Sequence, residues 1–229
     1  MTANNKNTNL KIDIDKYSHV SFDLWLTLIK SHPEFKGKRN LLFRDFFEID
    51  NLDKVSEVVR HYDVLCNDTC EKTGVNIDAY AIYDMILSEL GVDTAIAKGK
   101  YDAFYAASES LFLQFKPVLL FEDIHLLFED IQSQGKTMSI LSNTAFIKGA
   151  TLKKLLAYYD LERFFLFQIY SDETGFSKPN RKIFGQVYQQ KQEHNPVVSK
   201  SEILHVGDNI IADYNGALDF GFDAFLLKI

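Results

Sequence analysis

The sequence predicts an α/β fold in which a doubly wound parallel sheet is interrupted by an inserted all-helical cap domain. Three observations indicate this architecture. A short β-prone run lies near the N-terminus, a long segment with helical periodicity follows it, and strands then alternate with helices up to the C-terminus. Repeated β-α units form parallel sheets with helices on both faces. Because the first strand precedes the helical segment, that segment is predicted to be an insertion.

The predicted boundaries follow from these changes in pattern. Residues 1–16 begin polar and rich in Asn, which predicts an N-terminal tail. The first strand covers His19-Val20-Ser21-Phe22 and stops at a carboxylate. We therefore expect a core built from residues 17–30 and 116–229, and a helical cap from residues 31–115.

Apolar residues recur with helical spacing through the predicted cap, and no strand is expected there. They are Leu41, Leu42, Phe46 and Ile49, then Val55, Val58, Val59 and Tyr62, then Ile82, Met85, Ile86 and Leu90. Gly91 is typical of a helix end, and a further helix is expected over residues 95–113.

The C-terminal part alternates between the two kinds of element. Strands are predicted over residues 137–141, 164–170, 203–206 and 224–227. Helices are predicted over residues 121–134, 146–159 and 212–220, and one more begins at Pro179, because proline favours the first turn of a helix.

Composition excludes several classes of protein. The chain has 229 residues, is 46% hydrophobic and carries a net charge of −7, which is typical of a folded globular protein and argues against general nucleic-acid binding. No apolar run is long enough for a signal peptide or a membrane span, so we expect a cytoplasmic protein without a membrane partner. Two cysteines, Cys66 and Cys70, are too few for a disulfide scaffold or a structural zinc site. Oligomeric state is not predicted.

Polar side chains follow the predicted strands, where open α/β sheets bind their ligands. Asp23 and Ser142 end two strands, Lys178 lies shortly after a third, and Asp208 and Asp213 follow a fourth. Each residue alone is an ordinary turn or helix N-cap. Their joint occurrence at successive strand ends predicts a functional site.

Four motifs in this set resemble those of the haloacid dehalogenase superfamily, a large group dominated by phosphatases. They are Asp23-Leu24-Trp25-Leu26-Thr27, the strand ending in Ser142-Asn143, Lys178-Pro179, and Gly207-Asp208 followed by Asp213. The resemblance covers residues 17–229 and implies a Rossmann-like core. The long gap between the first two motifs is similar to that of members with a helical, C1-type cap.

The resemblance implies a role for each residue. Asp23 would be the nucleophile that forms an aspartyl-phosphate intermediate, and Lys178 would neutralise it and the transferring group. Ser142 and the backbone N–H of Asn143 would hydrogen-bond the phosphoryl oxygens. Thr27 would also bind the substrate.

The resemblance also implies a Mg²⁺ cofactor. It would be held by Asp23, the backbone carbonyl of Trp25 and Asp208, with Asp213 in the outer shell orienting a metal-bound water or Lys178. A Mg²⁺ ion would offset the repulsion between a carboxylate nucleophile and a phosphate dianion.

Trp25 departs from the pattern, because phosphatases of the superfamily carry there a second Asp that acts as general acid and base. The indole cannot transfer protons. Either the leaving group of a phosphorylated metabolite needs no acid, or a cap residue supplies the proton. Alternatively, the chain is a metal-independent 2-haloacid dehalogenase, or a catalytically weak binding or regulatory member of the fold.

The predicted cap would close over Asp23, exclude water and select the substrate. A run of cations, Lys30, Lys36, Lys38 and Arg39, opens the cap. We expect Lys38 and Arg39 to reach a small anionic substrate. His205 is expected to be structural.

Overall fold

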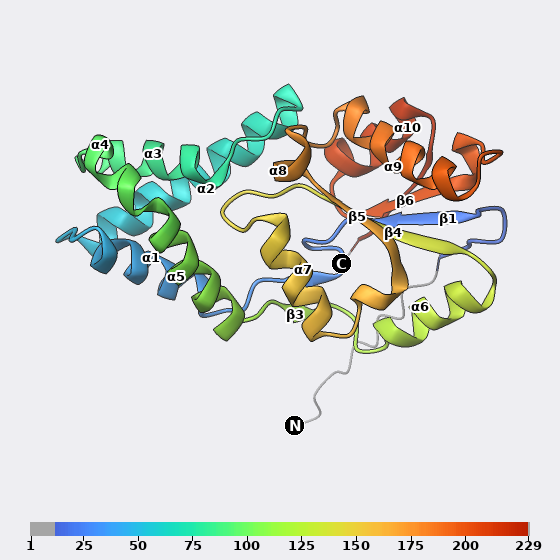
Figure 1. Ribbon diagram of the computed structural model, residues 1–229, viewed down its shortest axis with the longest axis horizontal. Helices are drawn as coiled ribbons and strands as arrows, with labels where there is room; N and C mark the ends of the chain where they lie inside the picture. Colours follow the sequence, from blue (N-terminus) through green and yellow to red (C-terminus); the bar gives the residue numbers. More distant parts are fainter. Residues whose placement is uncertain (1–11, 229) are drawn as a thin grey trace.

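The computed structural model describes residues 12–228 and confirms an α/β core with a helical insertion. Figure 1 shows the sheet and its helices on the right and the cap helices on the left. The sheet has five strands in the order β5-β4-β1-β6-β7, and every neighbouring pair is parallel. The strands are β1 (His19–Phe22), β4 (Thr137–Ser142), β5 (Phe165–Tyr170), β6 (Ile203–Gly207) and β7 (Asp223–Leu226).

Helices cover both faces of the sheet (Figure 1). One face carries α6 (Ile124–Ser133) and α7 (Gly149–Tyr158), and the other carries α8 (Ser171–Thr174), α9 (Arg181–His194) and α10 (Gly216–Phe220). Short 3-10 turns precede two strands, η2 (Glu162–Phe164) and η3 (Lys200–Glu202). Successive residues of a strand point to opposite faces. Accordingly, Ile140 belongs to the hydrophobic cluster of α6 and α7, and Leu141 to that of α9.

The cap contains α1 (Phe35–Phe46), α2 (Leu52–Thr73), α3 (Ala79–Glu89), α4 (Thr94–Ala97), the 3-10 turn η1 (Lys98–Lys100) and α5 (Tyr101–Gln114). The long helix α2 has defined ends: the Asn51 side chain accepts a hydrogen bond from the N–H of Lys54, and Gly74 ends the helix at φ +66°. The helix expected over residues 95–113 is divided into α4, η1 and α5.

Two very short strands join the cap to the core. β2 (Ile29–Lys30) and β3 (Val118–Leu119) pair antiparallel, so the chain enters and leaves the cap along adjacent paths. Strands of two residues have no periodicity, and for that reason the sequence did not predict this ribbon.

The structure corrects two other expectations. Ile14, which we assigned to the N-terminal tail, is 5% exposed and belongs to the main hydrophobic cluster, whereas residues 1–11 lie outside the described part of the chain. The helix expected over residues 212–220 is a π-helix, η4 (Ile210–Asn215), followed directly by α10.

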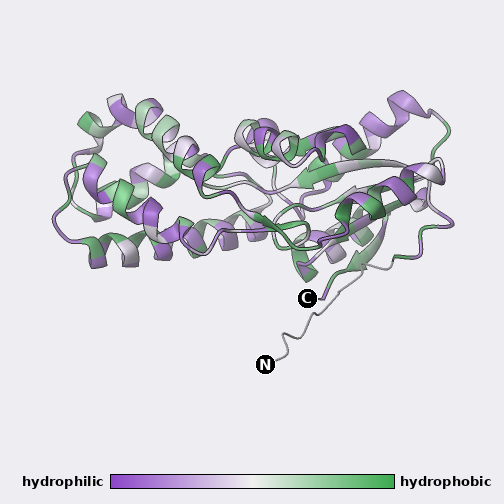
Figure 2. Ribbon diagram, turned by 90° about the horizontal axis from the view of Figure 1, so that it is seen from below, coloured by the Kyte–Doolittle hydropathy of each residue, from purple (hydrophilic) through white to green (hydrophobic). Residues whose placement is uncertain are grey.

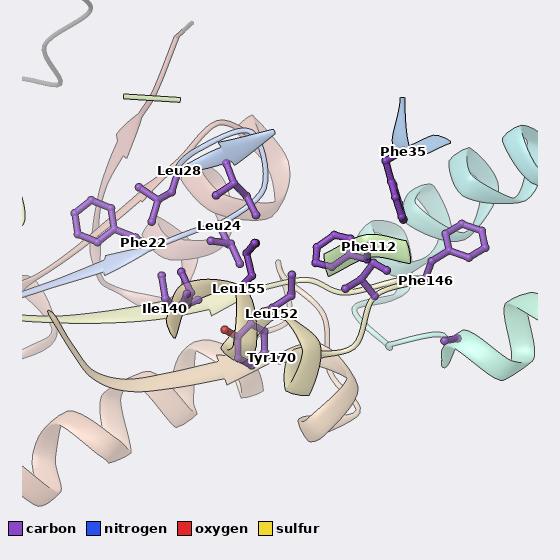
Figure 3. Packing of buried hydrophobic residues seen from close by; sticks show 14 of the residues in the cluster. Phe22, Leu24, Leu28, Phe35, Phe112, Ile140, Phe146, Leu152, Leu155 and Tyr170 are labelled. Atoms are coloured by element: carbon purple, nitrogen blue, oxygen red, sulfur yellow. The ribbon is translucent and has the colours of Figure 1, made fainter. Parts of the chain in front are cut away.

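Apolar packing continues from the sheet into the cap. Figure 3 shows Phe22, Leu24 and Leu28 beside the sheet and Phe35 and Phe112 at the cap, in one cluster. The strands are largely hydrophobic, whereas the cap helices alternate between hydrophilic and hydrophobic residues (Figure 2). Within residues 12–228, none of the helices has the length and apolar character that a membrane crossing requires.

Candidate active site

Three of the predicted site residues lie at one edge of the sheet. Asn143 follows β4, Asp23 follows β1 and Asp208 follows β6. Because these three strands are parallel neighbours, their carboxyl ends meet at the same edge. Lys178 reaches this edge from the loop between α8 and α9.

The ammonium group of Lys178 bridges two carboxylates of the site. Its Nζ lies 2.6 Å from Oδ1 of Asp23 and 2.6 Å from Oδ1 of Asp213, and it also donates to the carbonyl of Leu141 at 2.8 Å. The side chain is fully buried. Burial acts to lower the pKa of Lys178, but Asp213 and Asp23 outweigh it and raise that pKa above its ordinary value. Lys178 is therefore a fixed positive charge beside Asp23.

Asp23, Asp208 and Asp213 form a compact acidic cluster. Each offers an oxygen, and these oxygens all lie within 4.8 Å of one another. Burial raises the pKa of Asp23 to about 7, although Lys178 opposes the shift, and burial also raises the pKa of Asp208. Carboxylate oxygens at this spacing fit a hard divalent cation such as Mg²⁺. Such a cation would stabilise the ionised carboxylates and lower both pKa values.

Asp213 is held in its ionised form by its surroundings. Burial acts to raise its pKa, but Lys178 and His205 outweigh burial and lower it below the usual range. Oδ2 accepts a hydrogen bond from the N–H of Asn209 at 3.0 Å, and Oδ1 lies 3.2 Å from Nε2 of His205.

His205 is buried, and it has a more specific place than the sequence indicated. Its Nδ1 lies 3.0 Å from Oγ of Ser21, its register partner on β1, and its Nε2 faces Asp213. The sequence suggested a structural residue, and the structure shows that His205 orients a carboxylate of the site. The register between β1 and β6 places Ser21 opposite His205, and η4, which follows β6, brings Asp213 to Nε2 of the same ring.

Asn143 fixes the backbone of Lys178. Its Oδ1 accepts a hydrogen bond from the N–H of Lys178 at 2.7 Å, and its Nδ2 donates to the carbonyl of Lys178 at 3.1 Å. The amide side chain therefore ties the loop after β4 to the loop before α9. Asn143 also lines the cavity above the site, so its backbone N–H remains a candidate for binding a phosphoryl group.

Two predicted hydroxyl groups do not reach that cavity in this structure. Ser142 is fully buried and its hydroxyl donates to the carbonyl of Asn143 at 3.1 Å. Thr27 is also fully buried and donates to Oδ1 of Asp208 at 3.4 Å. Each hydroxyl is thus turned toward a protein acceptor and away from the space where a substrate would bind.

A cavity of about 490 Å³ lies between the core and the cap. Asp23, Lys178, Asp208 and Asp213 line its core side, and residues of α1 and α2 line its cap side. This volume is in the range of cavities that bind small molecules. The helical insertion thus forms one wall of the space that Asp23 faces.

Trp25 also lines the cavity, two residues after Asp23. Its ring packs edge-on against Phe112 of α5, with 6.2 Å between the centroids. The indole therefore belongs to the apolar contact between core and cap. The adjacent Leu26 has φ +58° and is 56% exposed at the turn that follows β1.

Of the two cations predicted to reach the substrate, Lys38 and Arg39, only Arg39 lines the cavity. Arg39 is 6% exposed and lines the cavity. Lys38 does not line it, because its Nζ lies over the ring of Phe115, 5.7 Å from the centroid. Arg60 of α2 also lines the cavity, and the sequence did not single it out because an isolated cation in an amphipathic helix carries no signal.

Cys66 and Cys70 are free, buried thiols on α2. Burial raises the pKa of Cys66 to about 11, so this thiol stays protonated. Neither cysteine lines the cavity. Both are therefore part of the packing of the cap.

Comparison with known proteins identifies the family. The model of the haloacid dehalogenase-like hydrolases matches residues 22–227. No curated protein matches the chain.

Several solved structures share the fold. The magnesium-bound YfnB protein of Bacillus subtilis is 23% identical, with 92% of this chain and 86% of that chain covered and a TM-score of 0.61. A HAD phosphatase from Thermococcus onnurineus is 18% identical, with coverage of 92% and 86% and a TM-score of 0.64. A 2-haloacid dehalogenase from Pseudomonas syringae is also 18% identical, with the same coverage and a TM-score of 0.59. The chain belongs to the haloacid dehalogenase-like hydrolases.

Proposed function

We propose that this chain is a Mg²⁺-dependent phosphatase that transfers a phosphoryl group from a small anionic metabolite to Asp23 and then to water. One observation carries the proposal: Asp23, Asp208 and Asp213 lie together with Lys178 on the core side of the cavity between core and cap. A dehalogenase that works without metal has no need for such a cluster. The magnesium bound in the YfnB structure, which shares the fold, gives further support.

The residues present can perform the two steps. An oxygen of Asp23 attacks phosphorus, the bond to the leaving group breaks, and the resulting aspartyl phosphate is then cleaved by water. Lys178, 2.6 Å from Asp23, neutralises the carboxylate and so reduces its repulsion of an incoming phosphate. Asp23, Asp208 and the backbone carbonyl of Trp25 would hold Mg²⁺, with Asp213 beside them. The ion would supply charge neutralisation during phosphoryl transfer.

Trp25 limits which substrates can react. An indole cannot protonate a leaving group, and loss of a general acid typically lowers a rate about 10²–10⁴-fold. We therefore propose that the substrates are compounds with a good leaving group, of which acyl phosphates are one class. Asp63, Asp68 and Glu71 of α2 also line the cavity and are the alternative source of a proton.

The first test measures phosphate release from acetyl phosphate and 4-nitrophenyl phosphate, with Mg²⁺ and with EDTA. We expect turnover only with Mg²⁺, and its loss in Asp23→Asn. A rate with EDTA equal to that with Mg²⁺, or no turnover of either compound, would contradict the proposal. Chloride release from 2-chloropropionate in EDTA would instead indicate a dehalogenase, and inactivity with every compound a binding or regulatory protein.

The second test restores the missing acid. Trp25→Asp is expected to raise the hydrolysis of an alkyl phosphate, whose leaving group needs a proton, about 10²-fold or more. Release of acetate from acetyl phosphate in a single turnover needs no such proton and should change little, because a base introduced at this position acts only on the later attack by water. An equal effect on the first turnover of both substrates would show that Trp25 does not limit departure of the leaving group through proton transfer.

A further inference from the structure

Arg39 of α1 is a buried cation that has no ionic partner in the described part of the chain. It is 6% exposed, and within residues 12–228 no carboxylate oxygen lies within 4.0 Å of its guanidinium group. Its Nε is buried and makes no hydrogen bond. A buried charge is ordinarily paired, because leaving it unpaired costs the full desolvation of the group.

The neighbours of Arg39 leave its N–H groups available. Its guanidinium lies over the ring of Phe146, with Cζ 4.5 Å from the centroid. Stacking uses the flat face of the guanidinium and leaves its edge for a ligand, and because Nε is buried the donors at issue are those of the two Nη groups. Phe146 comes from the loop after β4, so the stack joins the cap to the core beside the cavity.

The carboxylates on this wall of the cavity make no ion pair with Arg39 within the described residues. Asp63, whose charge opposes the lowering of the pKa of Arg39 by burial, has an oxygen 3.5 Å from Nζ of Lys36. Glu71 accepts a hydrogen bond from the side chain of Asn209 at 2.8 Å. The acidic residues on this wall of the cavity are thus partly engaged elsewhere.

We infer that the substrate carries, besides its phosphoryl group, a second oxyanion such as a carboxylate, which Arg39 binds at the cap end of the cavity. This inference rests on the proposed function for the phosphoryl end of the substrate. A guanidinium edge matches a carboxylate with two parallel hydrogen bonds. The carboxylate of the ligand would then form the ion pair that Arg39 lacks among the described residues.

The experiment compares two non-hydrolysable probes that differ only by a carboxylate in place of a methyl group, 3-phosphonopropionate and propylphosphonate. Their affinities for the full chain are measured by calorimetry in Mg²⁺. We expect 3-phosphonopropionate to bind at least tenfold more tightly, a difference of about 1.4 kcal/mol. Arg39→Met, which keeps the apolar stem, should remove that preference without weakening propylphosphonate. Lys38→Met, the adjacent cation outside the cavity, should keep the preference.

Stability supplies a second readout. Removing an unpaired buried charge should leave the melting temperature of ligand-free Arg39→Met unchanged or raised, whereas a structural role for Arg39 predicts a fall. The inference would be overturned if the parent protein bound both probes equally or bound neither. It would also be overturned if Arg39→Met kept the preference for 3-phosphonopropionate or had a clearly lower melting temperature. Because the probes report binding without turnover, a carboxylate preference in a chain that hydrolyses no phosphate would refute only the proposed function.

Discussion

Replacing Lys178 by methionine should destabilise the protein at neutral pH and make it dependent on divalent cations. Lys178 is fully buried and lies 2.6 Å from both Asp23 and Asp213. Methionine has nearly the same length but no charge. The variant therefore leaves the acidic cluster of Asp23, Asp208 and Asp213 without its internal cation.

The magnitude follows from burial. Removing one partner of a buried ion pair typically costs about 3–5 kcal/mol, because the remaining charges are left uncompensated. For a protein of this size, that corresponds to a fall of about 6–20 °C in melting temperature. Repulsion raises the carboxyl pKa values in the folded variant, so its folded state binds more protons than its unfolded state. The difference in free energy of unfolding between the parent protein and the variant should therefore shrink as the pH falls from 8 to 5.

The assay is urea or thermal unfolding in EDTA and in Mg²⁺. Mg²⁺ should stabilise Lys178→Met more than the parent protein, because the ion replaces the lost charge. Lys153→Met is the control: Lys153 pairs with Glu173 at 2.7 Å, but both side chains are more than a third exposed, and such pairs contribute about 0–1 kcal/mol. A loss below about 1 kcal/mol in Lys178→Met, in EDTA at pH 7, would refute the reasoning.

Three further predictions concern other parts of the molecule. Burial lowers the pKa of His19 from 6.5 to about 3, so below pH 6.5 the unfolded chain binds a proton that the folded chain does not. This residue should therefore lower the free energy of unfolding by about 2 kcal/mol at pH 5, and the stability of His19→Gln should depend less on pH between 6.5 and 5. A Cβ at Gly207 would lie 2.3 Å from the carboxylate carbon of Asp213, so Gly207→Ala should lower Mg²⁺ affinity, measured by calorimetry, whereas Gly37→Ala, with open space around it, should not. Mg²⁺ should raise the melting temperature of the parent protein, and Asp208→Asn should largely abolish that rise.

The order of elements and the main chemical groups were readable from the sequence. Alternation of strands and helices after residue 116 predicted the parallel sheet, and the polar residues at the strand ends predicted Asp23, Lys178 and Asp208 at one edge. This succeeds because strand periodicity and the direction of parallel strands are local properties that fix where each strand ends. The long gap after Asp23 likewise predicted the helical insertion.

The orientation of individual side chains was not readable. Ser142 and Thr27 stand in the right motifs, yet their hydroxyls face protein acceptors. Lys38 and Arg39 are adjacent in the sequence, but successive residues of a helix diverge by about 100°, and only one lines the cavity. No rule of local spacing distinguishes the two before α1 is placed against the core.

The sequence by itself therefore determined the fold class, the insertion and the acidic and basic groups of the site, because these depend on periodicity and on strand ends. Only the tertiary structure decided that His205 orients Asp213, that Asn143 clamps Lys178, and that Arg39 is buried beside Phe146 without a carboxylate among the described residues. These contacts depend on strand register and on the packing of the cap against the core, which join residues far apart in the chain.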